Sequence, residues 1–194
     1  MVNEIQDQRQ EQGASAEADR AGGPTDLSRD ASQPKALIPS AERVIFLDID
    51  GPMIPCAMYL IDHLCSIKRM MSPPAVAVLK ELCKRTGAKV VFNTTHNSPT
   101  GEAPDIEVAL QMAGLPAECI HPTAPKTRYP SLPRDLAVKE WLAAHPGADW
   151  IALDDVKFTD DPRLILIHPD EGLHTGHLND ALEHYGERPC VFLV

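Results

Sequence analysis

The stretch Val44-Ile-Phe-Leu-Asp-Ile-Asp-Gly51 decides the fold of this chain. Its first four residues are wholly apolar, and the run stops abruptly at Asp48. A short apolar run of this kind is typical of a central strand buried on both faces. Asp48 and Asp50 lie two residues apart on extended chain, so their carboxylates point the same way, and Gly51 allows the backbone to turn. Asp-Gly after a strand is also ordinary turn chemistry. This stretch alone therefore leaves open whether the two acids form a chemical site or only a turn.

A second pair of acids favours a chemical site over a simple turn. Asp154 and Asp155 follow another apolar run, Trp150-Ile-Ala-Leu153. Like-charged carboxylates gathered at one sheet edge repel each other unless a cation joins them, and Mg²⁺ prefers carboxylate oxygens and water. We therefore expect Asp48, Asp50, Asp154 and Asp155 to form a Mg²⁺ site. The alternative is that one pair merely favours a helix N-terminus, which explains both pairs less well.

Strands and helices are expected to alternate along the rest of the chain. This alternation predicts an α/β domain, a mostly parallel sheet with helices on both faces and ligands beyond the carboxyl ends of its strands. Further strands are predicted at 89–92, 150–153 and 164–167, with a short strand around Cys119-Ile120 and an edge strand at Cys190–Val194. Helices are predicted from Ser72 as N-cap to Gly87, from Asp105 to Ala113, from Pro133, and from Thr175 as cap to Tyr185.

Composition divides the chain into two parts. Residues 1–40 contain no aromatic residue and are rich in Gln, Glu, Ala, Ser, Asp and Gly, which predicts a disordered tail. Residues 41–194 are expected to form one domain. The formal net charge of -10 argues against extended binding to a nucleic-acid backbone, although a site for one phosphate with a metal ion stays compatible with it.

The location is expected to be cytoplasmic. The first residues lack the apolar segment of a secretory leader, and no run of about 18 apolar residues predicts a membrane span. The 5 cysteines are scattered and odd in number, which favours reduced thiols.

Two threonines follow the predicted strand at 89–92. The hydroxyl and backbone N–H groups of Thr94 and Thr95 can hold phosphate oxygens at such a strand end, although a capping role is an alternative.

In order along the chain come D-x-D-G, a Thr after the next strand, a basic residue opening a helix, and then D-D. This set resembles the haloacid dehalogenase (HAD)-like superfamily of phosphatases over about residues 43–185. More narrowly, the layout resembles the small HAD-like domains associated with RNA-repair proteins, with Gly172-Leu-His-Thr175 as the segment after the last strand. The resemblance implies a Rossmann-like, HAD-like α/β fold.

The resemblance assigns roles to the acids. Asp48 is implied as the nucleophile that forms an aspartyl-phosphate, and Asp50 as the acid that protonates the leaving oxygen and then activates water. Asp48, Asp154 and the backbone carbonyl of Asp50 are implied as Mg²⁺ ligands, assisted by Asp155.

The resemblance also implies two phosphate contacts. Thr95, or its neighbour Thr94, would bind a phosphate oxygen. A basic residue, usually Lys, would neutralise the aspartyl-phosphate; Arg134 fits the spacing, and Lys126 is the alternative. The narrower relatives carry Trp-Arg after the threonine, whereas this chain has His96-Asn97.

Residues 52–72 are expected to form a flap, because the stretch is apolar, rich in proline and too short for a cap domain. An open site suits a bulky phosphorylated substrate, such as a phosphoprotein or a nucleic-acid end. The leading prediction is a Mg²⁺-dependent phosphomonoester hydrolase. A catalytically idle metal- or phosphate-binding domain and a phosphoryl transferase are the alternatives, whereas a signalling receiver domain is disfavoured by the order of the motifs.

Overall fold

The computed structural model describes residues 41–61, 71–95, 103–123 and 133–191. The predicted tail, Lys126 and His96-Asn97 lie outside the described residues. The elements in chain order are β1 Arg43–Leu47, α1 Cys56–Ile61, α3 Pro73–Thr86, β2 Lys89–Phe92, α4 Ala103–Met112, the 3₁₀ turn η2 Ala117–Cys119, α5 Arg134–Ala144, β3 Asp149–Asp154, β4 Leu164–Leu166 and α6 Thr175–His184.

The four strands form one parallel sheet in the order β2-β1-β3-β4. Strand β1 is central, and its residues from Val44 to Leu47 are at most 1% exposed, as the apolar run predicts. Leu47 pairs with Phe92 of β2 and with Leu153 of β3, so these three strands end at the same level. The predicted parallel α/β fold is confirmed.

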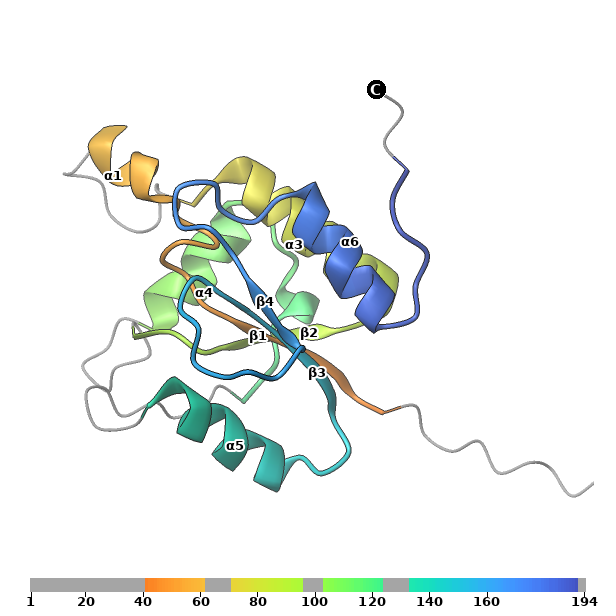
Figure 1. Ribbon diagram of the computed structural model, residues 1–194. Helices are drawn as coiled ribbons and strands as arrows, with labels where there is room; N and C mark the ends of the chain where they lie inside the picture. The colour runs from red at the N-terminus through yellow and green to blue at the C-terminus, as the bar shows by residue number, and fades with distance from the viewer. Residues whose placement is uncertain (1–40, 62–70, 96–102, 124–132, 192–194) are drawn as a thin grey trace, which may run out of the picture. The chain divides into compact units, whose positions relative to one another are not determined.

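Helices cover both faces of the sheet, as Figure 1 shows. The larger core lies where Leu47, Phe92 and Leu153 meet apolar residues of α3, α4 and α6. The smaller core lies on the other face, where Phe46 packs against Trp141 of α5. Side chains alternate between the two faces along a strand. The residues that follow Leu47, Phe92 and Leu153 must therefore point toward the face covered by α5.

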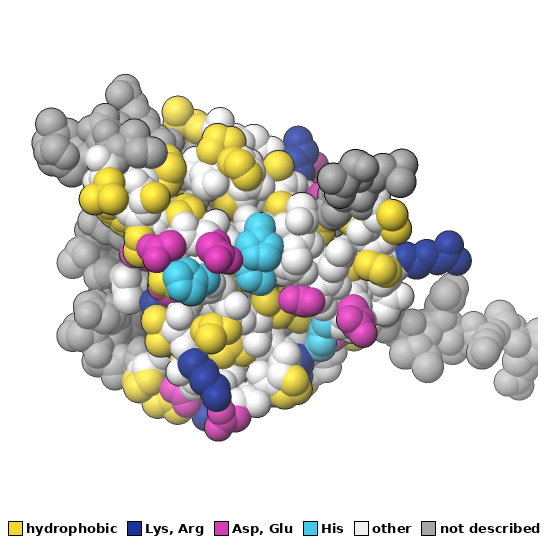
Figure 2. All heavy atoms as spheres, turned by 45° about the horizontal axis from the view of Figure 1, so that its top comes forward, with side chains coloured by type: hydrophobic (Ala, Val, Ile, Leu, Met, Phe, Trp, Pro, Cys, Tyr) yellow, Lys and Arg dark blue, Asp and Glu magenta, His cyan; other side chains and the backbone are white. Residues whose placement is uncertain are grey.

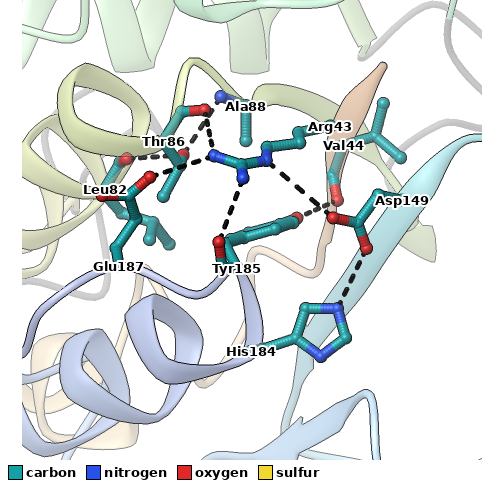
Figure 3. Close-up of polar contacts among 9 residues, drawn as sticks. All are labelled: Arg43, Val44, Leu82, Thr86, Ala88, Asp149, His184, Tyr185 and Glu187. Carbon is teal, nitrogen blue, oxygen red and sulfur yellow. Dashed lines mark hydrogen bonds and ion pairs between the residues drawn. The ribbon is translucent and has the colours of Figure 1, made fainter. Parts of the chain in front are cut away.

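Arg43 ties the amino end of β1 to two helices (Figure 3). Its guanidinium donates to the backbone oxygens of Thr86 at 3.1 Å and Tyr185 at 3.0 Å, and to the Glu187 carboxylate at 3.2 Å. The Tyr185 hydroxyl donates to the backbone oxygen of Val44 at 2.6 Å. These bonds hold the ends of α3 and α6 at the amino edge of the sheet, which leaves the carboxyl edge for the acids.

Helix α3 confirms the predicted caps. The Ser72 hydroxyl accepts from the backbone N–H of Ala75, and Gly87 follows the helix with a φ of 69°. Helix α6 differs, because His174 rather than Thr175 is its N-cap and forms a reciprocal capping box with His177. An unprotonated imidazole nitrogen accepts a backbone N–H as a hydroxyl oxygen does, so both histidines cap the start of α6.

One predicted short strand is reduced to a single bridge, and only the first two residues of another are described. Ile120 makes a single parallel bridge to Val90 after η2, not a strand. Cys190 and Val191 are not in a strand, and residues 192–194 lie outside the described part. The side chain of Asn179 on α6 bonds the backbone of Cys190, with its Oδ1 accepting from the Cys190 N–H at 2.8 Å. Side-chain bonds to α6 therefore hold the backbone at Cys190, where the described residues form no strand.

Candidate active site

Three polar residues stand side by side where β2, β1 and β3 end. Asp48 and Asn93 directly follow the paired residues Leu47 and Phe92, and Asp154 is the last residue of β3. The backbone N–H of Asp48 donates to Leu153 at 2.9 Å, and that of Asn93 donates to Leu47 at 2.8 Å, which continues the register. All three side chains are only 1% exposed. The sheet therefore gathers two carboxyls and a carboxamide in a buried row that points toward α5.

Arg134 supplies the positive charge opposite this row. It is the first residue of α5, and its Nη1 lies 2.8 Å from Asp48 Oδ2 and also contacts Asp154 Oδ1. The backbone N–H of Val156 donates to the same Asp154 oxygen at 2.8 Å. The prediction that α5 begins with the basic residue of the site agrees with this geometry, and the alternative, Lys126, lies outside the described residues.

Burial raises the pKa of both carboxyls despite Arg134. Removal from water raises the pKa of Asp48 to about 6, which Arg134, the backbone N–H of Ile49 and Thr94 partly oppose. Burial together with the charge of Asp48 raises the pKa of Asp154 to about 7. One guanidinium therefore does not fully balance two buried carboxylates near neutral pH, and a further cation would be favourable there.

The donor atoms at this edge fit a divalent cation. Asp48, Asp154 and Asp155 each offer a carboxylate oxygen, and these oxygens lie within 4.8 Å of one another. Asp48 Oδ1 and Asp154 Oδ2 are buried and have no hydrogen-bond partner among the described residues. Hard oxygen donors of this kind suit Mg²⁺ or a similar ion. Three of the four predicted metal residues come together here, and Asp50 would add its backbone carbonyl.

Gly51 is required by the close approach of two loops. Its φ is 81°, and a Cβ built on it would lie 2.7 Å from Cβ and 2.8 Å from Cγ of Asp155. A side chain here would be strained and would also push Asp155 out of place. The glycine after Asp50 therefore brings the first acidic motif against the second.

Replacing Gly51 with alanine is expected to damage both stability and metal binding. The left-handed backbone alone costs an L-residue about 1–2 kcal/mol, and displacement of Asp155 should lower Mg²⁺ affinity by at least about tenfold. Gly87→Ala is the matched control, because Gly87 has a φ of 69° and its Cβ would meet nothing within 4 Å. Urea unfolding and isothermal titration with Mg²⁺ measure both effects. Equal Mg²⁺ affinity in the two variants would contradict the role of the close approach.

Asp50 lies outside the buried row and contacts the flap. It is half-buried and makes an isolated bridge to Ile54 beyond the Gly51 turn. The hydroxyl of Tyr59 on α1 donates to Asp50 Oδ1 at 2.5 Å. Burial and this carboxylate raise the pKa of Tyr59 well above its usual value, so the hydroxyl keeps its proton. Sequence patterns gave no signal for Tyr59, because the contact depends on how the flap folds.

The two threonines take unequal positions. Thr94 is 2% exposed and its side chain hydrogen-bonds Asp48, whereas Thr95 is half-buried in the turn after it. Asn93 is a third polar residue at the end of β2, and the family resemblance assigns it no role. Both atoms of its carboxamide are buried without a partner among the described residues, next to Asp48. The signal available in the sequence was its position as the first residue after the apolar run that ends at Phe92.

The rim of the site is built by the segment between β4 and α6. The backbone N–H of Cys56 donates to Pro169 at 2.9 Å, and that of Leu173 donates to Pro52 at 2.9 Å. Figure 2 shows acidic and histidine side chains beside one another with only scattered lysine and arginine on the face drawn. In this segment His174 lies 3.6 Å from Glu171. Among the described residues, the face drawn in Figure 2 presents no extended basic surface.

The parallel sheet and its row of acids at the carboxyl edge define an α/β domain of the HAD-like class. Residues 44–178 match the family described as the HAD domain in Swiss Army Knife RNA repair proteins, and the chain belongs to this family. Both the broad and the narrower resemblance are thereby confirmed. No curated protein and no solved structure matches the chain. Among the described residues, no helix is both long enough and apolar enough to cross a membrane.

Proposed function

We propose that this protein is a Mg²⁺-dependent phosphomonoester hydrolase that works through an aspartyl-phosphate on Asp48. The observation that carries the proposal is the buried row itself. Asp48 has one oxygen bound by Arg134 at 2.8 Å and the other without a partner among the described residues. A carboxylate that is desolvated, oriented and still has an oxygen to offer is suited to nucleophilic attack on phosphorus.

Residues of this chain can carry out both steps of the reaction, the formation and the hydrolysis of the aspartyl-phosphate. An oxygen of Asp48 forms a bond to phosphorus while the ester P–O bond breaks, and Asp50 gives its proton to the leaving oxygen. Water then attacks the aspartyl-phosphate, Asp50 takes the proton from that water, and the bond between Asp48 and phosphorus breaks to release inorganic phosphate. Bound Mg²⁺, held by Asp48, Asp154 and the Asp50 carbonyl with help from Asp155, would neutralise charge on the phosphoryl oxygens.

Arg134 and the polar residues after β2 would bind the phosphoryl group. The guanidinium already sits on Asp48 and offers further N–H donors in a fixed plane. The carboxamide of Asn93 and the hydroxyl of Thr95 lie at the same strand end and can donate to phosphate oxygens, whereas the Thr94 hydroxyl is engaged with Asp48. Because Arg cannot give up its proton, its role is charge and orientation, and the moving proton belongs to Asp50.

A phosphate at a nucleic-acid end is the substrate class to test first. The family's description names RNA repair proteins, and the sequence predicts a short flap at 52–72 rather than a full cap domain, which suits a bulky substrate. The formal net charge of -10 supports binding of an end rather than of a long backbone.

We also propose a cytoplasmic location for the protein, and we propose that residues 1–40 form a tail outside the domain.

The full chain should release inorganic phosphate in the presence of Mg²⁺ and lose this activity in EDTA. The panel consists of 4-nitrophenyl phosphate, sugar phosphates, mononucleotides, phosphoserine peptides, and RNA and DNA oligonucleotides phosphorylated at either end. The ratio of kcat/KM between an oligonucleotide end and its mononucleotide reports the substrate class. Mg²⁺ binding without turnover on any member would contradict hydrolysis and favour a binding domain.

A further inference from the structure

Tyr59 stands out because it reaches from the flap to Asp50. Its hydroxyl donates to Asp50 Oδ1 at 2.5 Å, although the side chain belongs to α1 and is 42% exposed. Helix α1 is fixed at its start, where the backbone N–H of Cys56 donates to Pro169 at 2.9 Å. Met58 packs against the larger core, which fixes the helix face beside Tyr59. The phenol is therefore aimed at the carboxyl by an anchored element.

We propose that Tyr59 is a positioning residue that orients the carboxyl of Asp50 for proton transfer to the leaving group. This inference rests on the proposed hydrolase function. It adds to that function a role for α1, which holds the acid of the reaction in place as well as lying beside the site.

The need for such a residue follows from the position of Asp50. Asp50 is half-buried beyond the end of β1, and the Tyr59 hydroxyl is one of the groups that contact it. The terminal torsion of an Asp side chain is broad, so packing alone does not choose which oxygen faces the substrate. A hydrogen bond to one oxygen fixes the plane of the carboxyl and pre-organises the other for the reaction.

The hydrogen bond fits both protonation states that the reaction requires. When Asp50 is the acid, Oδ2 carries the proton and Oδ1 accepts from Tyr59. The proton on Oδ2 passes to the leaving oxygen as the ester bond breaks. The resulting carboxylate still accepts from Tyr59, and Oδ2 then takes a proton from the attacking water. Tyr59 itself neither gains nor loses a proton.

The test compares substrates that depend differently on proton transfer. Breaking an alkyl ester requires protonation of a strongly basic leaving oxygen, whereas 4-nitrophenolate leaves with little help. Tyr59→Phe keeps the aromatic ring and removes only the hydroxyl. We expect this variant to lose about tenfold in kcat on an alkyl phosphate such as glycerol phosphate and less than about threefold on 4-nitrophenyl phosphate.

Two further variants give the experiment its controls. Leu60→Ala alters the neighbouring residue of the same helix, whose side chain is 86% exposed, and should change neither rate. In an Asp50→Asn background, Tyr59→Phe should add no further loss, because two residues that act through one step are not additive.

Several outcomes would overturn the inference. Equal losses on both substrates, or a rise in KM with kcat unchanged, would show that Tyr59 shapes the flap or contacts substrate instead. Full additivity with Asp50→Asn would show that it acts elsewhere. Failure of the proposed function looks different, because the wild-type chain would then hydrolyse neither substrate, and the inference would fail with it.

Discussion

Asp48→Asn is expected to lower turnover by at least about a thousandfold while the protein stays folded. An amide has no anionic oxygen to attack phosphorus, so the covalent step is lost even though the shape of the site is kept. Release of phosphate from the best substrate of the panel, with saturating Mg²⁺, measures the effect. Trapping of the aspartyl-phosphate with acid should detect it in the wild type and not in the variant.

We expect Asp48→Asn to stabilise the metal-free protein at pH 8. Burial raises the folded-state pKa of Asp48 to about 6 from the ordinary 3.8, so the folded state binds more protons than the unfolded state between these values. Stability from this group is therefore lost as the pH rises through about 6. Asn carries no charge, so the variant does not bear the free-energy cost of a buried carboxylate. Active-site residues often lower stability in this way while supporting activity.

Asp160→Asn is the control for both measurements, because its side chain is 94% exposed and lies in a surface pair with Lys157. It should leave turnover and urea unfolding in EDTA unchanged. Turnover by Asp48→Asn within tenfold of the wild type would show that the nucleophile is another group.

The acidic strand ends were predictable because they depend on local pattern and on one general property of parallel sheets. The apolar run before Asp48 predicts a buried strand, and so does the run before Asp154. Carboxyl ends of parallel strands share one edge, so the two acids had to meet once the strands were assigned. The family resemblance implied a basic residue, and counting back along the apolar face of α5 favoured Arg134, with Lys126, which lies outside the described residues, as the alternative.

The remaining features depend on tertiary register that no local pattern carries. Asn93 stands level with Asp48 because Leu47 pairs with Phe92, and a slip of one residue would turn it to the other face. Tyr59 meets Asp50 only because Cys56 is tied to the segment before α6. The bond between Asn179 of α6 and the backbone of Cys190 is a contact of the same kind.

Arg134→Met is expected to destabilise the metal-free protein by about 3 kcal/mol at pH 8. Arg134 Nη1 bridges the carboxylates of Asp48 and Asp154, each 1% exposed, and Met replaces the side chain without its charge. The variant leaves two like charges buried without a counter-ion. Turnover should also fall by at least about a hundredfold, because charge on the phosphoryl group loses its fixed partner.

The destabilisation should depend on pH and on metal in a way that identifies its cause. The pKa values of Asp48 and Asp154 are about 6 and about 7 with Arg134 present, and removing the guanidinium raises both further. The penalty is therefore small near pH 5, where both carboxyls keep protons, and it grows as the pH rises through 7. Mg²⁺ should reduce it at pH 8 by supplying charge to the same oxygens.

Lys139→Met on the same helix gives the comparison, because Lys139 pairs with Asp135 in a surface contact with its own side chain 69% exposed. This pair should contribute less than about 1 kcal/mol and respond to neither pH 5 nor Mg²⁺. Urea unfolding of both variants at pH 5 and pH 8, with and without Mg²⁺, separates the two cases. A loss for Arg134→Met that stays constant across all four conditions would mean that Arg134 stabilises α5 by packing. Its bridge between the two acids would then contribute nothing to the stability of the metal-free site.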